Sequence, residues 1–273
     1  MNAERTLNVG AELRDAEARL GEALKRLAVF AAIAERLGKL PEGADLPSAD
    51  IVMHFGGLSH VAPNEQRRES KEVRENFAAY CARFAVVGMI TACEEFLQRI
   101  LFIVRLGEFA AKSGATLTGE QFIQTREKTR KEVRRLSVDG LPMQILAAIH
   151  RNSVPLPELD WFRGVYSIRK CLVHRNGVIG EDDVDEHGIA SAKWRKAAMQ
   201  IGDKEIAALP IPVQAGDVLS VQFVDSVRTW QLGDSVILTA QECQEVALTL
   251  STFCSRMSLL AGQGVAELVK GRG

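Results

Sequence analysis

The chain lacks the motifs by which the commonest enzyme classes are recognised in a sequence. It contains no G-x-S-x-G, G-x-x-x-x-G-K-[ST], G-x-G-x-x-G or H-E-x-x-H pattern. Their absence excludes the usual routes to hydrolases, P-loop nucleotidases, dinucleotide enzymes and metalloproteases. No internal repeat is visible either, so we do not expect a repeat architecture. Any chemistry must come from a less common set of residues, and we expect no cofactor.

Cysteines are few and show no pairing pattern. They are odd in number and form no C-x-x-C motif, which argues against a disulfide framework and favours a reducing compartment. We expect most of them to be small residues of the core. The five are Cys81, Cys93, Cys171, Cys243 and Cys254.

Long apolar segments and a strong net charge are also absent. The longest apolar run, residues 84–93, is far shorter than the ~20 residues that a spanning helix needs. The charged residues 1–20 lack the apolar segment of a signal peptide. With a net charge of −1, any binding to RNA or to a membrane has to come from a local patch. We therefore expect a cytoplasmic protein that makes no membrane contact.

The N-terminal pattern predicts a helical arm, residues 1–40, that is separate from a domain at residues 65–265. Within the arm, Leu13, Leu20 and Leu27 recur at heptad spacing, so the helix packs either on its own domain or against a second chain. The Pro- and Gly-containing residues 38–64 are interpreted as an irregular connector. Its two histidines, in HFGGLSH, have no further ligand in range, and we expect no metal site.

A second long helix is predicted at residues 67–106, and Glu94 lies within its apolar stripe. A carboxylate in an apolar seam needs a partner, because leaving it unpaired costs several kcal/mol. Arg169 is a candidate for that partner. The alternative is that Glu94 lies at the edge of the seam, in water.

The rest of the domain is predicted as four helices with a β segment. Thr118 with Gln121, and Thr239 with Glu242, each form a capping box that starts a helix. The acidic stretch EDDVDEH lacks the spacing of a calcium loop and is interpreted as solvated. The helices are expected at residues 118–136, 139–151, 158–176 and 239–260, the β segment at 180–238 with a hairpin in QLGDSVIL, and a frayed tail after 260.

The helix at residues 118–136 is strongly basic. A cluster of cations on a few helical turns can contact RNA phosphates, and the alternative is an ordinary solvated face. The candidate RNA-binding residues are Arg126, Lys128, Arg130, Lys131, Arg134 and Arg135.

The segment IRKCLVHRNG combines Arg169 and His174 at the end of a predicted helix. A guanidinium binds phosphate through a fork of donors, and an imidazole transfers protons near neutral pH. The pair is therefore suited to phosphate chemistry without a metal. The alternative is structural, because Arg and His near a helix C-terminus also interact favourably with its free carbonyls.

Together, the order of elements and the R-x-x-x-x-H motif followed by Asn-Gly resemble the HEPN superfamily of prokaryotic helical domains, over about residues 67–260. The resemblance implies a mainly α fold: a helical bundle with a small β insertion, here with a long N-terminal helix added. Lys170 stands where members often have Asn directly after the arginine, and Asn176 lies beyond the histidine. Glu94, Lys170 and Asn176 are the expected supporting residues of the site.

For catalytic members, the resemblance implies metal-independent RNA cleavage at the interface of a homodimer. His174 would be the general acid or base, and Arg169 would hold the scissile phosphate. Such toxin or phage-defence enzymes also suggest a cognate antitoxin as a partner. Two alternatives remain: a non-catalytic dimerisation or interaction module, and a sensor that binds RNA or nucleotide without cutting it.

Overall fold

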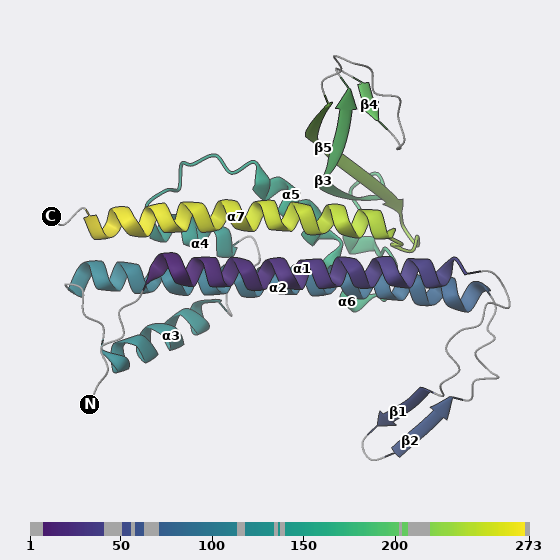
Figure 1. Ribbon diagram of the computed structural model, residues 1–273, viewed down its shortest axis with the longest axis horizontal. Coiled ribbons are helices and arrows are strands. Elements are labelled where there is room, and N and C mark those ends of the chain that lie inside the picture. The colour runs from purple at the N-terminus through teal and green to yellow at the C-terminus, as the bar shows by residue number, and fades with distance from the viewer. Residues whose placement is uncertain are drawn as a thin grey trace.

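Three long helices form the body of the protein, which is mainly helical. They are α1 (Val9–Gly38), α2 (Lys71–Ser113) and α7 (Ala240–Lys270), and they lie side by side (Figure 1). The computed structural model describes residues 8–40, 51–55, 58–62, 71–113, 118–133, 136, 140–201, 204–206 and 219–270.

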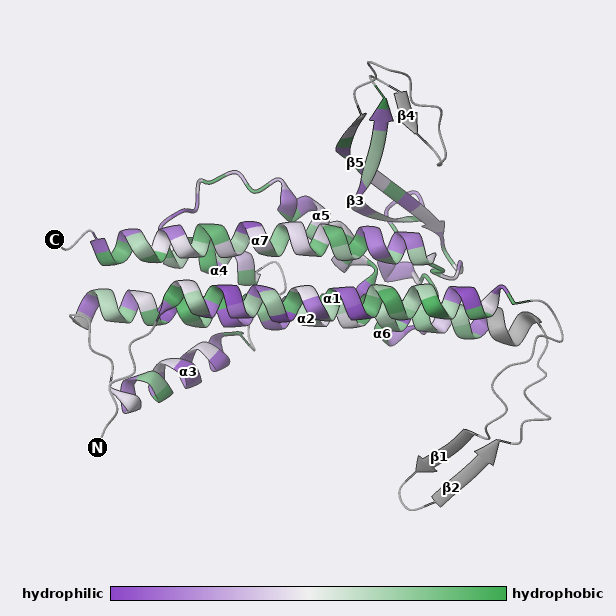
Figure 2. Cartoon of the chain, viewed as in Figure 1, coloured by the Kyte–Doolittle hydropathy of each residue, from purple (hydrophilic) through white to green (hydrophobic). Residues whose placement is uncertain are grey.

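Helix α1 packs on α2 and α7, and these contacts bury its Leu13, Leu20 and Leu24 within the chain. It runs antiparallel to α2, where Arg99 bridges Glu12 at 2.9 Å and Asp15 at 2.7 Å. At the other end, the Phe30 and Phe84 rings meet edge to face, with centroids 6.3 Å apart. Figure 2 shows apolar and polar residues alternating along these helices, the pattern of helices with one buried face.

Helix α7 runs parallel to α2, and the two share the centre of the core. The Cys93 and Cys254 sulfurs, both fully buried, lie 2.9 Å apart between them. All five cysteines are free and buried, whereas we expected no disulfide framework and most of the cysteines in the core. The expected capping box starts α7: the Thr239 amide donates to Glu242 at 2.7 Å, and the Glu242 amide donates to the Thr239 hydroxyl at 3.1 Å.

Shorter helices connect the long ones. Helix α4 packs on α2 and α7 through buried Leu141 and Ile145, and α5 stacks Phe162 on Phe253 of α7 at 4.5 Å between ring centroids. Helix α3 begins at the predicted Thr118–Gln121 capping box. Their bounds are Gly119–Val133 for α3, Gly140–Ala148 for α4, Glu158–Ser167 for α5 and Arg169–His174 for α6, with a short 3-10 turn at Glu181–Asp183.

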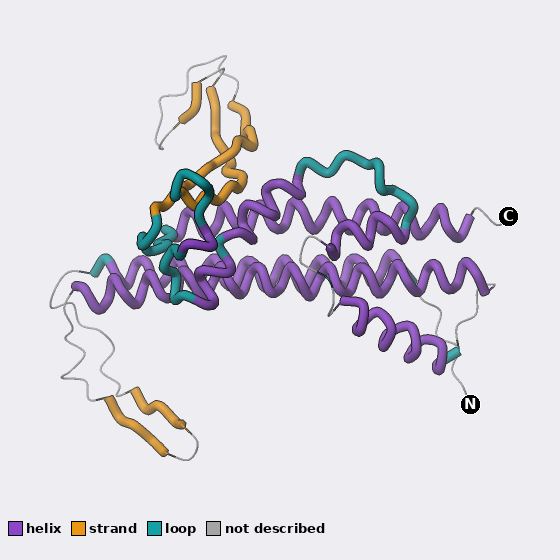
Figure 3. The backbone as a smooth tube through the Cα atoms, turned by 180° about the vertical axis from the view of Figure 1, so that it is seen from behind, coloured by secondary structure: helices purple, strands orange, loops and turns teal. Residues whose placement is uncertain are grey.

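The β insertion is an antiparallel sheet at one end of the bundle (Figure 3). Its strands, in the order β4-β3-β5, are β3 (Ile189–Ile201), β4 (Lys204–Ile206) and β5 (Leu219–Gln231). Trp194 on β3 is buried beneath α7, and its indole N–H donates to Glu245 at 2.8 Å. A mainly helical protein with a small β insertion was therefore predicted correctly.

Two predictions were wrong, one about the connector at residues 38–64 and one about the C-terminal tail. Residues 38–64 are not wholly irregular, because β1 (Ile51–Phe55) and β2 (Leu58–Ala62) pair as an antiparallel hairpin. Residues 271–273 lie outside the described part of the chain, but residues 261–270 do not fray, because α7 continues to Lys270. Its last turns pack on the core through buried Val265, whose methyls leave no room for a side chain at Gly107.

Two predictions about the middle of the chain also need correction. The helix expected at residues 158–176 is divided at Ile168 into α5 and α6. The Ser167 hydroxyl lies 2.7 Å from the Gly164 carbonyl oxygen and 3.1 Å from that of Ser191 on β3, contacts that compete with regular helix. QLGDSVIL turns at Gly233, but its second half forms only an isolated bridge between Ser235 and Val178.

Candidate functional site

Helix α6 carries the Arg169/His174 pair and is fixed to α2 at both ends. At its start, Arg169 lies 3.5 Å from Glu94, and beyond its end Arg83 donates to the backbone carbonyl of Asn176. Arg83 and Glu94 are eleven residues apart, or about 16 Å along one face of α2. Helix α6 therefore lies along that face, antiparallel to α2.

The Asn-Gly stop shapes the end of α6. Asn176 and Gly177 have φ values of 53° and 81°, in the left-handed region that these two residue types tolerate best. The amides of Arg175 and Gly177 both donate to the Cys171 carbonyl, at 3.0 and 2.9 Å. Asn176 thus acts through its backbone conformation and its contact with Arg83, which also covers Gly177 closely.

Arg169 sits in a half-buried cluster with Glu94 and Tyr166. Its guanidinium lies 3.3 Å from the Tyr166 hydroxyl and 5.5 Å from the centre of the Tyr166 ring. Burial raises the pKa of the Glu94 carboxyl, while the Arg169 charge and the Tyr166 hydroxyl oppose the rise. The expected pairing of Glu94 with Arg169 is confirmed, and it gives Arg169 a structural contact.

His174, in contrast, is exposed and makes no hydrogen bond or ion pair with any residue that the structure describes. It is the last residue of a six-residue helix. Residues five apart on an α-helix are turned by about 140° and separated by about 7.5 Å along its axis. Arg169 therefore faces α2 while His174 faces away, and the pair does not converge within one chain.

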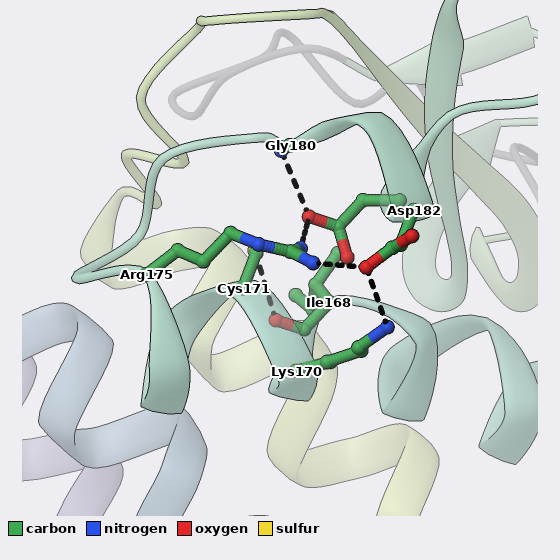
Figure 4. A network of polar contacts seen from close by, with 7 residues as sticks. Ile168, Lys170, Cys171, Arg175, Gly180 and Asp182 are labelled. Atoms are coloured by element: carbon green, nitrogen blue, oxygen red, sulfur yellow. Dashed lines mark hydrogen bonds and ion pairs between the residues drawn. The ribbon is translucent and has the colours of Figure 1, made fainter.

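An ion network covers the outer side of α6 (Figure 4). Asp182 binds Lys170 at 3.3 Å and Arg175 at 2.8 Å, and the nearly buried Asp183 pairs with Arg175 and accepts the Gly180 amide at 2.9 Å. The acidic stretch EDDVDEH was predicted to be a solvated loop. That prediction is wrong for its first half, because Asp182 and Asp183 bind residues at α6. Lys170, the residue that departs from the motif, has its charge partly balanced by Asp182.

Sequence reasoning missed four residues of this region: Arg83, Tyr166, Arg175 and Asp183. Opposite charges at Arg175 and Asp182–Asp183, on either side of a glycine-containing turn, were a usable signal for the ion network. Arg83 and Tyr166 gave no such signal, because their roles depend on the register of α6 against α2.

The basic helix does not present one cationic face. Lys128 and Lys131 line a groove of about 710 Å³ between α3 and α2, whereas Arg126 and Arg130 are exposed outside it. Arg134 and Arg135 lie outside the described residues. The groove is distant from His174: its nearest residue on α2, Arg105, is 22 positions, or about 33 Å, along the helix from Arg83.

Within the described ranges, no helix is both long and apolar enough to cross a membrane, and no cluster of three or more acidic, His or Cys side chains could hold a metal ion. No protein-family model, curated protein or solved structure matches the chain. The resemblance to the HEPN superfamily therefore rests on the sequence motif and the order of elements alone.

Proposed function

We propose that the protein is a HEPN-like, metal-independent endoribonuclease of the toxin or phage-defence kind, acting in the cytoplasm as a homodimer. The observation that carries the proposal is the exposed, unpartnered His174 at the end of a helix that is fixed at both ends. An imidazole held in this way can accept the proton of a ribose 2′-hydroxyl or donate one to the leaving oxygen. Arg169 would stabilise charge on the scissile phosphate, and an antitoxin would be a further partner.

A dimer is supported by an apolar surface next to α6, which we call the α1–α2 patch. Its side chains are large and between 37% and 57% exposed, and such surfaces mark interaction sites. Arg83 directly precedes Phe84 of the patch and contacts Asn176, so the patch adjoins the end of α6. The patch consists of Val29, Phe30, Ile33, Leu37, Phe77, Tyr80 and Phe84.

The direct test is cleavage of RNA by the purified protein in the presence of a chelator. His174→Ala should lower the rate by about 10² to 10⁴, the range for losing a general acid or base. His187→Ala is the matched control, because His187 is also exposed and its side chain pairs with Glu186 in the acidic stretch. Equal rates for His174→Ala and the unaltered protein would exclude the catalytic role.

A second candidate function is a non-catalytic dimerisation or interaction module. It is favoured by the contacts of Arg169 with Glu94 and Tyr166, which show the arginine bracing α5 and α6 on α2. In that case no RNA is cut, and Arg169→Lys lowers the melting temperature without any effect on RNA. The melting temperature and the cleavage rate, measured on the same preparations, distinguish the two functions.

A further inference from the structure

We infer that the groove between α2 and α3 binds the phosphate backbone of single-stranded RNA, at a site separate from His174. The inference takes its ligand class from the proposed function, but it does not require that RNA be cut. The groove has a volume of about 710 Å³ and is formed where the C-terminal half of α2 packs on α3. We call it the α2–α3 groove.

Two walls of side chains define the α2–α3 groove. The α2 wall consists of Arg105, Glu108, Phe109 and Lys112, which follow one another at helical spacing and so share one face. The α3 wall presents Gln121, Gln124, Lys128 and Lys131 among its polar residues. Lysine and glutamine side chains can reach phosphates, 2′-hydroxyls and base edges.

The charges of the groove favour an anionic ligand. Arg105 bridges Glu108 and Glu132 at 2.7 Å each, so these three side chains, which are about three-quarters buried, together carry one negative charge. Lys112, Lys128 and Lys131 are exposed and have no acidic partner among the residues that the structure describes. The lining as a whole has four cations and two carboxylates, a net charge of +2, and its three lysines face one concave surface of a protein whose net charge is only −1.

The shape of the groove favours a single strand over a duplex. Its volume of about 710 Å³ is that of a small-molecule pocket, which gives room for a few nucleotides of an extended strand and not for a duplex. Because the groove begins at Arg105, which is 22 positions or about 33 Å along α2 from Arg83 and the end of α6, a dinucleotide cannot touch both the groove and His174. The α2–α3 groove would therefore hold RNA at a distance from the proposed cleavage site.

The test compares two double variants on the same helix. Lys128→Gln/Lys131→Gln removes two cations from the groove, and Arg126→Gln/Arg130→Gln removes two that lie outside it. The probe is a fluorescein-labelled, 2′-O-methylated single strand of about 20 nucleotides, longer than the 4–16 that single-strand folds cover. Methylation removes the 2′-hydroxyl nucleophile, so binding is measured without cleavage.

For the groove variant we expect weaker binding and a slope of log affinity against log salt that is shallower by about 1.4, since each single-strand phosphate contact contributes about 0.7. Lys112→Gln, on the α2 wall, should reduce the slope by about half as much. The control variant should keep the slope of the unaltered protein. All three should keep its melting temperature, because the altered charges are exposed.

Three results would overturn the inference. The first is that the unaltered protein does not bind the probe, and the second is that both double variants lose the same affinity for it. The third is that phosphatidylserine vesicles bind as tightly as the probe and lose the same affinity in the groove variant. Groove-dependent binding by a protein that cuts no RNA would support the groove while refuting the ribonuclease proposal. If cleavage needs His174 but binding of the probe does not depend on the groove lysines, the ribonuclease proposal is supported and the groove is refuted. The two proposals therefore fail on different measurements.

Discussion

At the scale of single residues, the ion pair between Glu94 and Arg169 determines how the candidate site responds to pH. Burial raises the pKa of Glu94 above its ordinary value despite the arginine. The native state therefore favours the protonated carboxyl, so the contribution of Glu94 to stability is largest below its unfolded pKa and is lost as pH rises through the higher folded pKa. Arg169 limits that loss, because it compensates the ionised carboxylate.

Arg169→Gln should therefore raise the pKa of Glu94 further and destabilise the protein in a pH-dependent way. We expect a loss of about 1–3 kcal/mol in the free energy of unfolding near pH 7.5 and a smaller loss near pH 4, where Glu94 is protonated. Denaturant titration at both pH values measures the effect. Arg26→Gln is the control, because its surface pair with Glu22 contributes little. Equal losses at the two pH values would contradict the role given to Glu94.

The cysteines give a second prediction at this scale. Burial raises the pKa of Cys171 to about 11 and that of Cys243 to about 12, and all five thiols are buried. Because the thiolate is the reactive form, the native protein should take up almost no maleimide at neutral pH, and the unfolded protein should take up five equivalents. Mass spectrometry after brief labelling counts them. Rapid labelling of the native state would indicate that the helices open locally.

At the scale of elements, the sequence predicts those features of a helix that depend on residues close by in the chain, such as where the helix begins. The two capping boxes mark where α3 and α7 begin, because Thr118–Gln121 and Thr239–Glu242 satisfy amides within the same turn. The cost of an unpaired carboxylate made Arg169 a candidate partner for Glu94, but it left open the alternative of Glu94 in water, and the packing of α6 on α2 decides between them. The break at Ile168 was not, because it depends on a contact between Ser167 and β3 that no local pattern encodes.

The close approach of α5 to β3 can be tested at Gly164. A Cβ built there would lie 2.4 Å from the Lys193 carbonyl oxygen, which is backbone and cannot rotate away. Gly164→Ala should therefore force the helix off the sheet and destabilise the protein by about 1–3 kcal/mol. Gly21→Ala, in α1 with nothing within 4 Å of the added Cβ, should stabilise it by up to about 1 kcal/mol. Thermal unfolding of both variants shows whether the signs differ as expected.

At the scale of the whole molecule, the α1–α2 patch predicts a two-fold homodimer. Phe84, which is 57% exposed and touches Phe30, lies within the patch, so Phe84→Glu should give a monomer in sedimentation or light scattering with little change in melting temperature. Leu259→Glu is the control, because Leu259 is 51% exposed on α7 outside the patch. A monomeric unaltered protein at micromolar concentration, or dimers in the Phe84 variant, would exclude this interface.

The geometry of α6 also predicts that each site of such a dimer contains residues from both protomers. Because Arg169 and His174 face about 140° apart on one helix, a working site would combine Arg169 of one protomer with His174 of its partner. Arg169→Lys keeps the charge beside Glu94 but loses the phosphate fork, and His174→Ala loses the proton carrier, so each variant alone should be nearly inactive. In a mixture that exchanges subunits, half of the dimers contain both variants and each of these has one intact site. The mixture should therefore recover about a quarter of the unaltered activity. A mixture as inactive as its components would show that each site uses the arginine and histidine of a single chain, against the arrangement of α6 on α2.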